Sequence, residues 1–208
     1  MVMSDIVSLD LYDEPDNDGT SDSTANYRID FGLYETIDLG NLVWEDYDND
    51  GIKDMDEPGF PNIIVTLSQP GPDGLACTND DIEIGIDTTD ANGAYLFEYL
   101  NPNEYFVTLS NIPDGFNSSS GEGFMDADGN GANEPAADPD TDINNDDDGT
   151  EAYLPDGTKI IKSDIFNLAL YTEPTDDDDT DNATNYSIDF GLYESLEIGN
   201  LVLSLIHI

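Results

Sequence analysis

The stretch Thr88–Leu109, "TTDANGAYLFEYLNPNEYFVTL", decides the fold class. Aromatic and β-branched residues alternate with polar ones on both sides of Asn92-Gly93, a pair typical of tight turns, so we expect one strand before the turn and two after it. The run Asn62–Ser68, "NIIVTLS", is a further β-branched segment, and no window of ten or more residues shows helical spacing of apolar side chains. The sequence therefore predicts an all-β fold, an antiparallel β-sandwich with long acidic loops between its strands.

The charge balance is the most unusual property of the composition. The 208 residues include 48 acidic and four basic ones, for a net charge of −44, while 38% are hydrophobic and 10% aromatic. That apolar content is sufficient for a packed core, but the self-repulsion opposes compaction. The chain supplies almost no counter-charge of its own, so we expect bound divalent cations to provide it. Nucleic acid and anionic membrane surfaces are disfavoured as partners for the same reason.

A twelve-residue segment, Asp46–Glu57 or "DYDNDGIKDMDE", matches the calcium-loop pattern D-x-[DN]-x-[DN]-G-x₅-E at every specified position. In that pattern alternate oxygens converge on the ion, the glycine allows a sharp turn and the last glutamate supplies two oxygens. The predicted ligands of Ca²⁺ are Asp46, Asp48, Asp50, the Ile52 carbonyl, Asp54 and Glu57. Lys53 is expected to point outward.

The alternative for this loop is a solvated acidic turn, since aspartate is abundant in the chain. Aspartate enrichment does not account for Gly51 at position 6 or Glu57 at position 12, and these two residues favour a metal site. Pro58-Gly59 follows directly and would stop a helix at once. We therefore predict a calcium loop between strands, without the helix-opening switch of calcium sensors.

A second acidic segment, "DADGNGANE", gives a weaker match. Its candidate ligands are Asp126, Asp128, Asn130 and Glu134, but position 12 is Ala137, so the site would be incomplete or would be closed by carboxylates from residues 138–148. The segment "NNDDDG" at residues 144–149 and the pair Asp80-Asp81 lack a closing acid. We expect both of these to be solvated.

The chain repeats itself at a fixed offset. Residues 4–43 align without a gap with residues 163–202, a shift of 159 positions, and both copies contain "DFGLYE" followed by "GNLV". Such self-similarity predicts a tandem array of domain-sized units. The predicted organisation is the end of one repeat (1–36), a complete repeat (37–195), the first strand of the next (196–202) and a divergent tail (203–208) that resembles read-through of non-coding sequence.

Two segments together, "LGNLVWEDYDNDGIKDMDEPGFPNIIVTLS" and Thr88–Leu109, resemble the B-domain repeats of serine-aspartate-repeat bacterial surface adhesins, which are collagen-adhesin B-type modules. The resemblance covers residues 39–109, including the opening strand with Gly40 and Trp44, the acidic loop, and Gly93 in the turn region. It implies an immunoglobulin-like or transthyretin-like sandwich, Ca²⁺ as a structural ligand, secretion and surface display. No signal peptide is visible in the sequence, and no apolar run is long enough to cross a bilayer.

These observations lead us to expect a calcium-stabilised spacer repeat, a stalk segment of a secreted or cell-surface adhesin-like protein. Its partners would be calcium ions and neighbouring repeats of the same chain. The alternative is a module that binds a protein or glycan through the sandwich surface or the acidic loops. The tyrosines that might serve such binding are expected to pack against strands instead: Tyr12, Tyr34, Tyr153 and Tyr171.

Catalysis is not expected of this chain. The only histidine, His207, lies in the divergent tail, and Cys77 is the only cysteine, so no disulfide and no histidine- or cysteine-based catalytic pair can form within the repeat. Carboxylates are so abundant that no pair stands out as an acid–base couple. We therefore predict neither catalytic residues nor an organic cofactor.

Overall fold

The computed structural model describes residue 5 and residues 29–33, 35–119, 147–173 and 182–195. Two compact units are present, Met1–Glu35 and Thr36–Ile208, and the strands belong to the second. The weaker candidate ligands Asp126, Asp128, Asn130 and Glu134 lie outside the described residues. Within the described residues no helix is long and apolar enough to span a bilayer.

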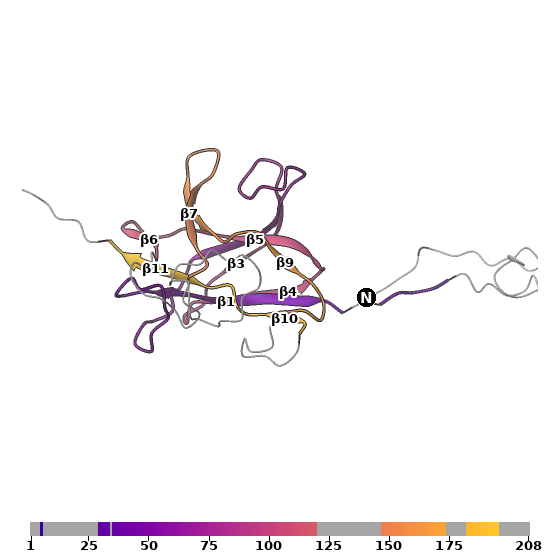
Figure 1. The fold of residues 1–208 in the computed structure, drawn as a ribbon, viewed down its shortest axis with the longest axis horizontal. Helices are drawn as coiled ribbons and strands as arrows, with labels where there is room; N and C mark the ends of the chain where they lie inside the picture. The colour runs from indigo at the N-terminus through magenta and orange to yellow at the C-terminus, as the bar shows by residue number, and fades with distance from the viewer. Residues whose placement is uncertain (1–4, 6–28, 34, 120–146, 174–181, 196–208) are drawn as a thin grey trace, which may run out of the picture. The chain divides into compact units, whose positions relative to one another are not determined.

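The second unit is a β-sandwich, as predicted, built from a five-stranded and a six-stranded sheet (Figure 1). The first sheet contains β4 (Ala94–Leu100), β10 (Thr184–Asn185), β1 (Ile37–Glu45), β11 (Phe190–Glu194) and β6 (Phe116–Ser118). The second sheet contains β3 (Ile82–Thr88), β2 (Ile64–Gln69), β5 (Asn103–Ser110), β8 (Lys159–Lys162), β7 (Thr150–Tyr153) and β9 (Phe166–Leu168).

The core lies between the two sheets and follows the period-two pattern of the sequence. In β4 the side chains of Tyr95 and Phe97 are buried while those of Leu96 and Glu98 are exposed, because successive strand residues point to opposite faces. Central β5 is buried on both faces, so Phe106 and Val107 are both inaccessible to solvent. The predicted packing of tyrosines is wrong for Tyr153 and Tyr171, whose exposed fractions are 65% and 64%.

The turn at Asn92-Gly93 forms as predicted but does not make a hairpin. The strand before it, β3, pairs with β2 in the second sheet, whereas β4 after it pairs with β1 in the first sheet. The turn closes through Gly93 N donating to Asp90 O at 3.1 Å, and Gly93 has a φ of 86°. This connection therefore joins the two sheets across one edge of the sandwich.

Two strand pairs of the first sheet are parallel, which the sequence did not indicate. The first half of β1 pairs with β10 and its second half with β11, both in parallel orientation. Parallel alignment places the first three residues of β11 beside the last three of β1, with Glu45 opposite Leu192. The loop that follows β1 and the end of β11 therefore lie at the same end of the sandwich.

Candidate metal centre

The acidic loop Asp46–Glu57 is attached at both ends to the first sheet. Trp44 forms a β-bridge with Gly59, and Glu45 N donates to Pro58 O at 2.9 Å, so the two ends of the loop lie side by side. Strand β1 precedes the loop and no helix follows it. The prediction that this loop joins strands and is not flanked by helices is confirmed.

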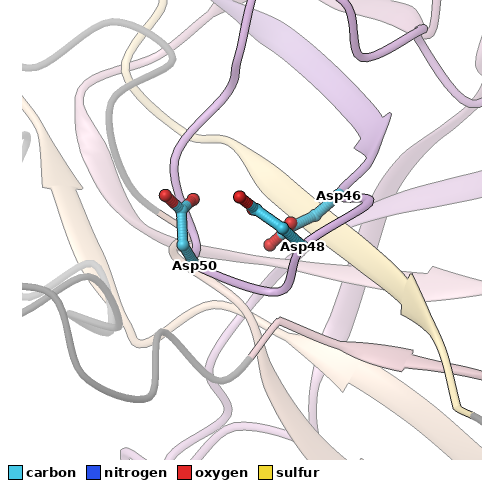
Figure 2. A group of neighbouring side chains, drawn as sticks. All are labelled: Asp46, Asp48 and Asp50. Atoms are coloured by element: carbon cyan, nitrogen blue, oxygen red, sulfur yellow. The ribbon is translucent and has the colours of Figure 1, made fainter.

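Three of the predicted ligands come together in the bend of this loop. One carboxylate oxygen from each of Asp46, Asp48 and Asp50 lies within 4.8 Å of the other two (Figure 2). Asp46 is buried, Asp50 is half-buried and Asp48 is exposed, so the group opens towards solvent on one side. Hard oxygen donors converging from alternate positions are the set that Ca²⁺ prefers, and the three residues fit such an ion.

Asp46 organises the turn as well as belonging to this group. Its Oδ1 accepts a hydrogen bond from Asn49 N at 2.6 Å, and its Oδ2 accepts one from Gly51 N at 2.9 Å and one from the Ser119 hydroxyl at 2.6 Å. Asn49 and Gly51 both have positive φ, 59° and 80°, which the sharp bend requires. The loop is therefore shaped by the same carboxylate that contributes to the group.

Glu57 closes the loop from its other end. Its Oε1 accepts from Tyr47 N at 2.7 Å and its Oε2 from Asp54 N at 2.9 Å, and the residue is only 6% exposed. Glu57 and Asp54 are not members of the three-carboxylate group. Ile52 N donates to Asp50 Oδ1 at 2.9 Å, and no contact of the Ile52 carbonyl identifies it as a ligand among the described residues. These three remain predicted ligands.

The sequence led us to expect that Lys53 would only point outward, but its side chain also contacts the backbone of the loop. Its ammonium group donates to the carbonyl of Asp54 at 2.9 Å and to that of Glu57 at 2.6 Å. Carbonyl oxygens at the end of the loop thereby gain a cationic partner, while the carboxylates of the group do not. The lysine stiffens the second half of the loop and leaves its negative charge in place.

The electrostatics of the loop favour a positive ion. Burial raises the pKa of the Asp50 carboxyl, and the neighbouring carboxylates of Asp48, Asp46 and Asp54 add to the rise. Burial also raises the pKa of Glu57, again with contributions from Asp46 and Asp48, against the hydrogen bonds from Asp54 N and Tyr47 N. Packing these charges together therefore costs free energy, which a bound cation would offset.

Two further carboxylates, Asp147 and Asp148, are buried beside the start of β11, although the sequence led us to expect a solvated segment there. Both are fully inaccessible. Asp147 Oδ1 accepts from Gly149 N and Gly191 N, at 2.9 and 3.0 Å, and Asp148 Oδ2 accepts from Asp189 N at 2.6 Å. The expectation was wrong because two of these donors, Asp189 N and Gly191 N, lie more than 40 positions away in the sequence, where local pattern analysis does not detect them.

The buried carboxylates are linked to the acidic loop through a pair of serines. The Ser118 hydroxyl donates to Asp147 Oδ2 at 3.0 Å, and the Ser119 hydroxyl donates to Asp46 Oδ2. Burial raises the pKa of Asp147 well above its usual range, and Asp46 contributes further, against the hydrogen bonds from Gly149, Gly191 and Ser118. The acidic loop and the closing strand are thus electrostatically coupled.

We expect Asp147→Asn to stabilise the protein in EDTA at about pH 8, since asparagine can keep the acceptor for both backbone N–H groups without the buried charge. A carboxyl whose pKa is raised on folding stabilises the fold below its unfolded pKa, and this contribution is lost as pH rises through the folded pKa. In EDTA, acidification from about pH 8 to 5 should therefore raise Tm more in the wild type than in Asp147→Asn.

Asp156→Asn is the matched control for this measurement, because Asp156 is exposed in the turn after β7. Its Oδ1 accepts the N–H of Thr158 at 2.9 Å, a bond that an asparagine oxygen can also accept. The control should follow the wild type. A lower stability of Asp147→Asn at every pH would contradict the prediction.

The pair Asp80-Asp81 shapes a different loop. Asp81 accepts hydrogen bonds from Gly71 N at 3.2 Å and Thr78 N at 2.7 Å, and Asp80 accepts one from the Thr78 hydroxyl at 2.7 Å. The hydrogen bond from Thr78 lowers the pKa of Asp80, which is exposed as predicted. These residues close a turn between β2 and β3, and neither belongs to the three-carboxylate group.

Comparison with known proteins adds an independent observation. The profile of the family described as SdrD B-like domain matches residues 37–153. Serine-aspartate repeat-containing protein I of Staphylococcus saprophyticus is 37% identical over 91 residues, which are 43% of this chain and 4% of that protein. Serine-aspartate repeat-containing protein F of Staphylococcus epidermidis is 37% identical over 112 residues, 50% of this chain and 6% of that protein.

Similarity extends beyond bacteria. Colossin-B of Dictyostelium discoideum is 36% identical over 95 residues, 43% of this chain and 2% of that protein. The chain thus spans only a small part, 2% to 6%, of these three relatives.

Proposed function

Since the chain belongs to the SdrD B-like domain family, we propose that it is a calcium-stabilised structural repeat, a stalk segment of a secreted or cell-surface adhesin-like protein. Residues 37–195 form the complete repeat in this proposal, preceded by the end of another repeat (1–36) and followed by the start of a third (196–202). The chain has no catalytic role in this proposal. Its partners are calcium ions and the adjoining repeats.

The convergence of Asp46, Asp48 and Asp50 is the observation that carries the calcium part of the proposal. It is supported by the scarcity of internal counter-charge, because in the described part of the chain ion pairs join only Lys159 to Glu151 and Lys162 to Asp164. Asp54 and Glu57, with the Ile52 carbonyl, are proposed to complete the shell through small movements of the loop. In the loop of residues 126–134, the proposed additional ligands are Asp126, Asp128, Asn130 and Glu134.

The position of the loop supports a structural role for the ion. Asp46 N donates to Leu192 O at 2.9 Å, so the first residue of the loop is hydrogen-bonded to the strand that closes the repeat. Ser119 connects the loop to the same strand, with Ser119 N donating to Gly191 O at 2.9 Å. An ion held in the loop would therefore stabilise the end of the sandwich at which β11 ends.

Calorimetric titration of the full chain with Ca²⁺ tests the proposal. We expect Asp48→Ala to lower the number of ions bound by one relative to wild type, because Asp48 is an exposed member of the group and its loss leaves the loop's own hydrogen bonds intact. Asp156→Asn removes the same charge from an exposed turn and should leave the stoichiometry unchanged. If both variants bind as many ions as the wild type with equal affinity, Asp46–Glu57 is not the metal site.

A further inference from the structure

The segment "IDFGLYE" occurs twice in the chain, at residues 29–35 and at residues 188–194, without any difference between the copies. The second copy contains β11, and three of its apolar side chains are fully inaccessible to solvent: Ile188, Phe190 and Leu192. In the first copy the described residues 29–33 belong to no strand. The equivalent side chains there have exposed fractions of 45%, 55% and 81%: Ile29, Phe31 and Leu33. One sequence is therefore buried in one place and uncovered in the other.

The site that β11 occupies, between β1 and β6, is selective for this sequence. β11 pairs in parallel with β1 and antiparallel with β6. A Cβ on Gly191 would lie 2.6 Å from Ser119 Oγ and 2.8 Å from the Trp44 ring, so the position requires glycine. Phe190 and Leu192, on either side of it, belong to the core between the sheets. Residues 31–33 supply phenylalanine, glycine and leucine in the same order.

The identical sequence indicates what would cover the exposed side chains of residues 29–33. The surroundings that bury β11 fit this segment equally well, so the β11 site of a repeat of this kind is its complementary surface. Within one chain that site already holds residues 190–194, which have the advantage of a high effective concentration. A copy whose own β11 has left the site offers it empty.

We propose that residues 29–35 are a donor strand, which completes the sandwich of a second copy of the chain whose own β11 has left its site. The donated strand pairs with β1 and β6 as β11 does, and its apolar side chains enter the core between the sheets. Main-chain hydrogen bonds supply affinity, and the fit of the side chains supplies specificity, as in other cases of strand addition. The proposal rests on the repeat organisation of the proposed function and not on its calcium.

Association by the donor strand is head-to-tail and open-ended, because the donor segment and the β11 site are different surfaces of the same chain. The donor strand leads into the repeat of its own chain at Ile37. β11 leads in the same way into residues 196–202, the proposed first strand of the next repeat. Each donation thus reproduces the connectivity of the tandem array without a covalent join between the two copies.

The opposing force is repulsion between two chains that each carry a net charge of −44. Added salt screens such repulsion, while it has little effect on the burial of apolar side chains. Association through the donor strand should therefore strengthen as the ionic strength rises. An ion-pair contact between the copies would weaken instead.

The variant Phe190→Asp opens the β11 site for the test, because a charge at this fully buried position opposes the return of β11. The donor segment is left unchanged. Sedimentation velocity of the full chain, over a series of concentrations in EDTA, measures association. We expect the wild type to remain monomeric. The average mass of Phe190→Asp should rise with concentration and with added salt.

Gly32→Ala is the matched change in the donor strand. Nothing lies within 4 Å of the position of a Cβ at Gly32, so the substitution should not alter the stability of the single chain. In the β11 site the added methyl would overlap Ser119 and Trp44, as it would at Gly191. Phe190→Asp/Gly32→Ala should therefore associate at least about tenfold more weakly than Phe190→Asp.

A labelled peptide of residues 28–36 provides a second measurement, which does not depend on the folding of Phe190→Asp. The wild-type chain is unfolded in urea and refolded by dilution into an excess of this peptide, and the retained label is measured after gel filtration. A peptide with Gly32→Ala is the control. We expect the native peptide to be retained at least about tenfold more than the control, because only its glycine fits beside Trp44.

Three results would overturn the donor-strand proposal. These are a folded Phe190→Asp that stays monomeric, equal association with and without Gly32→Ala, and equal retention of the two peptides. Equal association of the variants would show that another surface joins the copies. A chain that passes these tests in EDTA and binds no calcium would refute the calcium proposal alone.

Discussion

Saturating calcium should raise the melting temperature of the chain by about 5–10 °C relative to EDTA at the same ionic strength. At a free calcium concentration a hundred times the dissociation constant, binding to the folded state adds about 2.7 kcal/mol. For a chain of this length, each kcal/mol corresponds to about 2–4 °C. The physical reason is that the folded loop holds Asp46, Asp48 and Asp50 together at a cost that the unfolded chain does not bear.

Asp48→Ala separates metal binding from the loop's own stability. Asp48 is the exposed member of the group, so its substitution should leave the melting temperature in EDTA unchanged or slightly higher, because one repulsive charge is removed. The calcium-induced rise should fall clearly below that of the wild type. Ionic strength is held at about 0.15 M because added salt alone screens surface charges. An equal calcium-induced rise in variant and wild type would contradict the prediction.

Gly93→Ala should cost about 4 kcal/mol or more of the free energy of unfolding. A Cβ at this position would lie 2.1 Å from Val43 O and 2.7 Å from Phe60 N, both backbone atoms, and the residue has a φ of 86°. Gly93 O also accepts the N–H of Val43 at 2.9 Å, so the turn cannot move away without losing that bond. Costs of this size are unusual for one methyl group and require a clash with fixed backbone.

Gly157→Ala distinguishes steric overlap from backbone strain. Gly157 has nearly the same φ, 88°, but nothing lies within 4 Å of the position of its Cβ. Its substitution should therefore cost only the strain of the left-handed conformation, about 1–2 kcal/mol. Urea unfolding in calcium buffer gives both values. Equal costs at the two positions would show that the close approach of Gly93 to β1 is unimportant for stability.

The strands and the turn of residues 88–109 were predictable because their signals are local. Alternation predicted a strand where β4 lies, and Asn92-Gly93 marked the turn. Which strands pair was not predictable, since the partners of β3 and β4 are set by packing across the whole domain. Pairing of β1 with β11 joins residues more than 140 positions apart, a separation over which local patterns carry no information.

The candidate site was predictable to a similar degree. Spacing alone identified Asp46, Asp48 and Asp50, because the pattern follows from the geometry of one continuous loop. It did not indicate that Asp147 is buried nearby, since the donors to its carboxylate come from Ser118 and Gly191, in other strands.

The parallel pairing of β1 and β11 has a mechanical consequence. Strand β1 begins at Ile37 and β11 ends at Glu194, and the two strands run side by side in the same direction. Tension applied at the start of β1 and at the end of β11 therefore acts along the strands and in opposite senses on each. The hydrogen bonds between them are loaded in shear and share the force, rather than opening one after another as in a pulled hairpin.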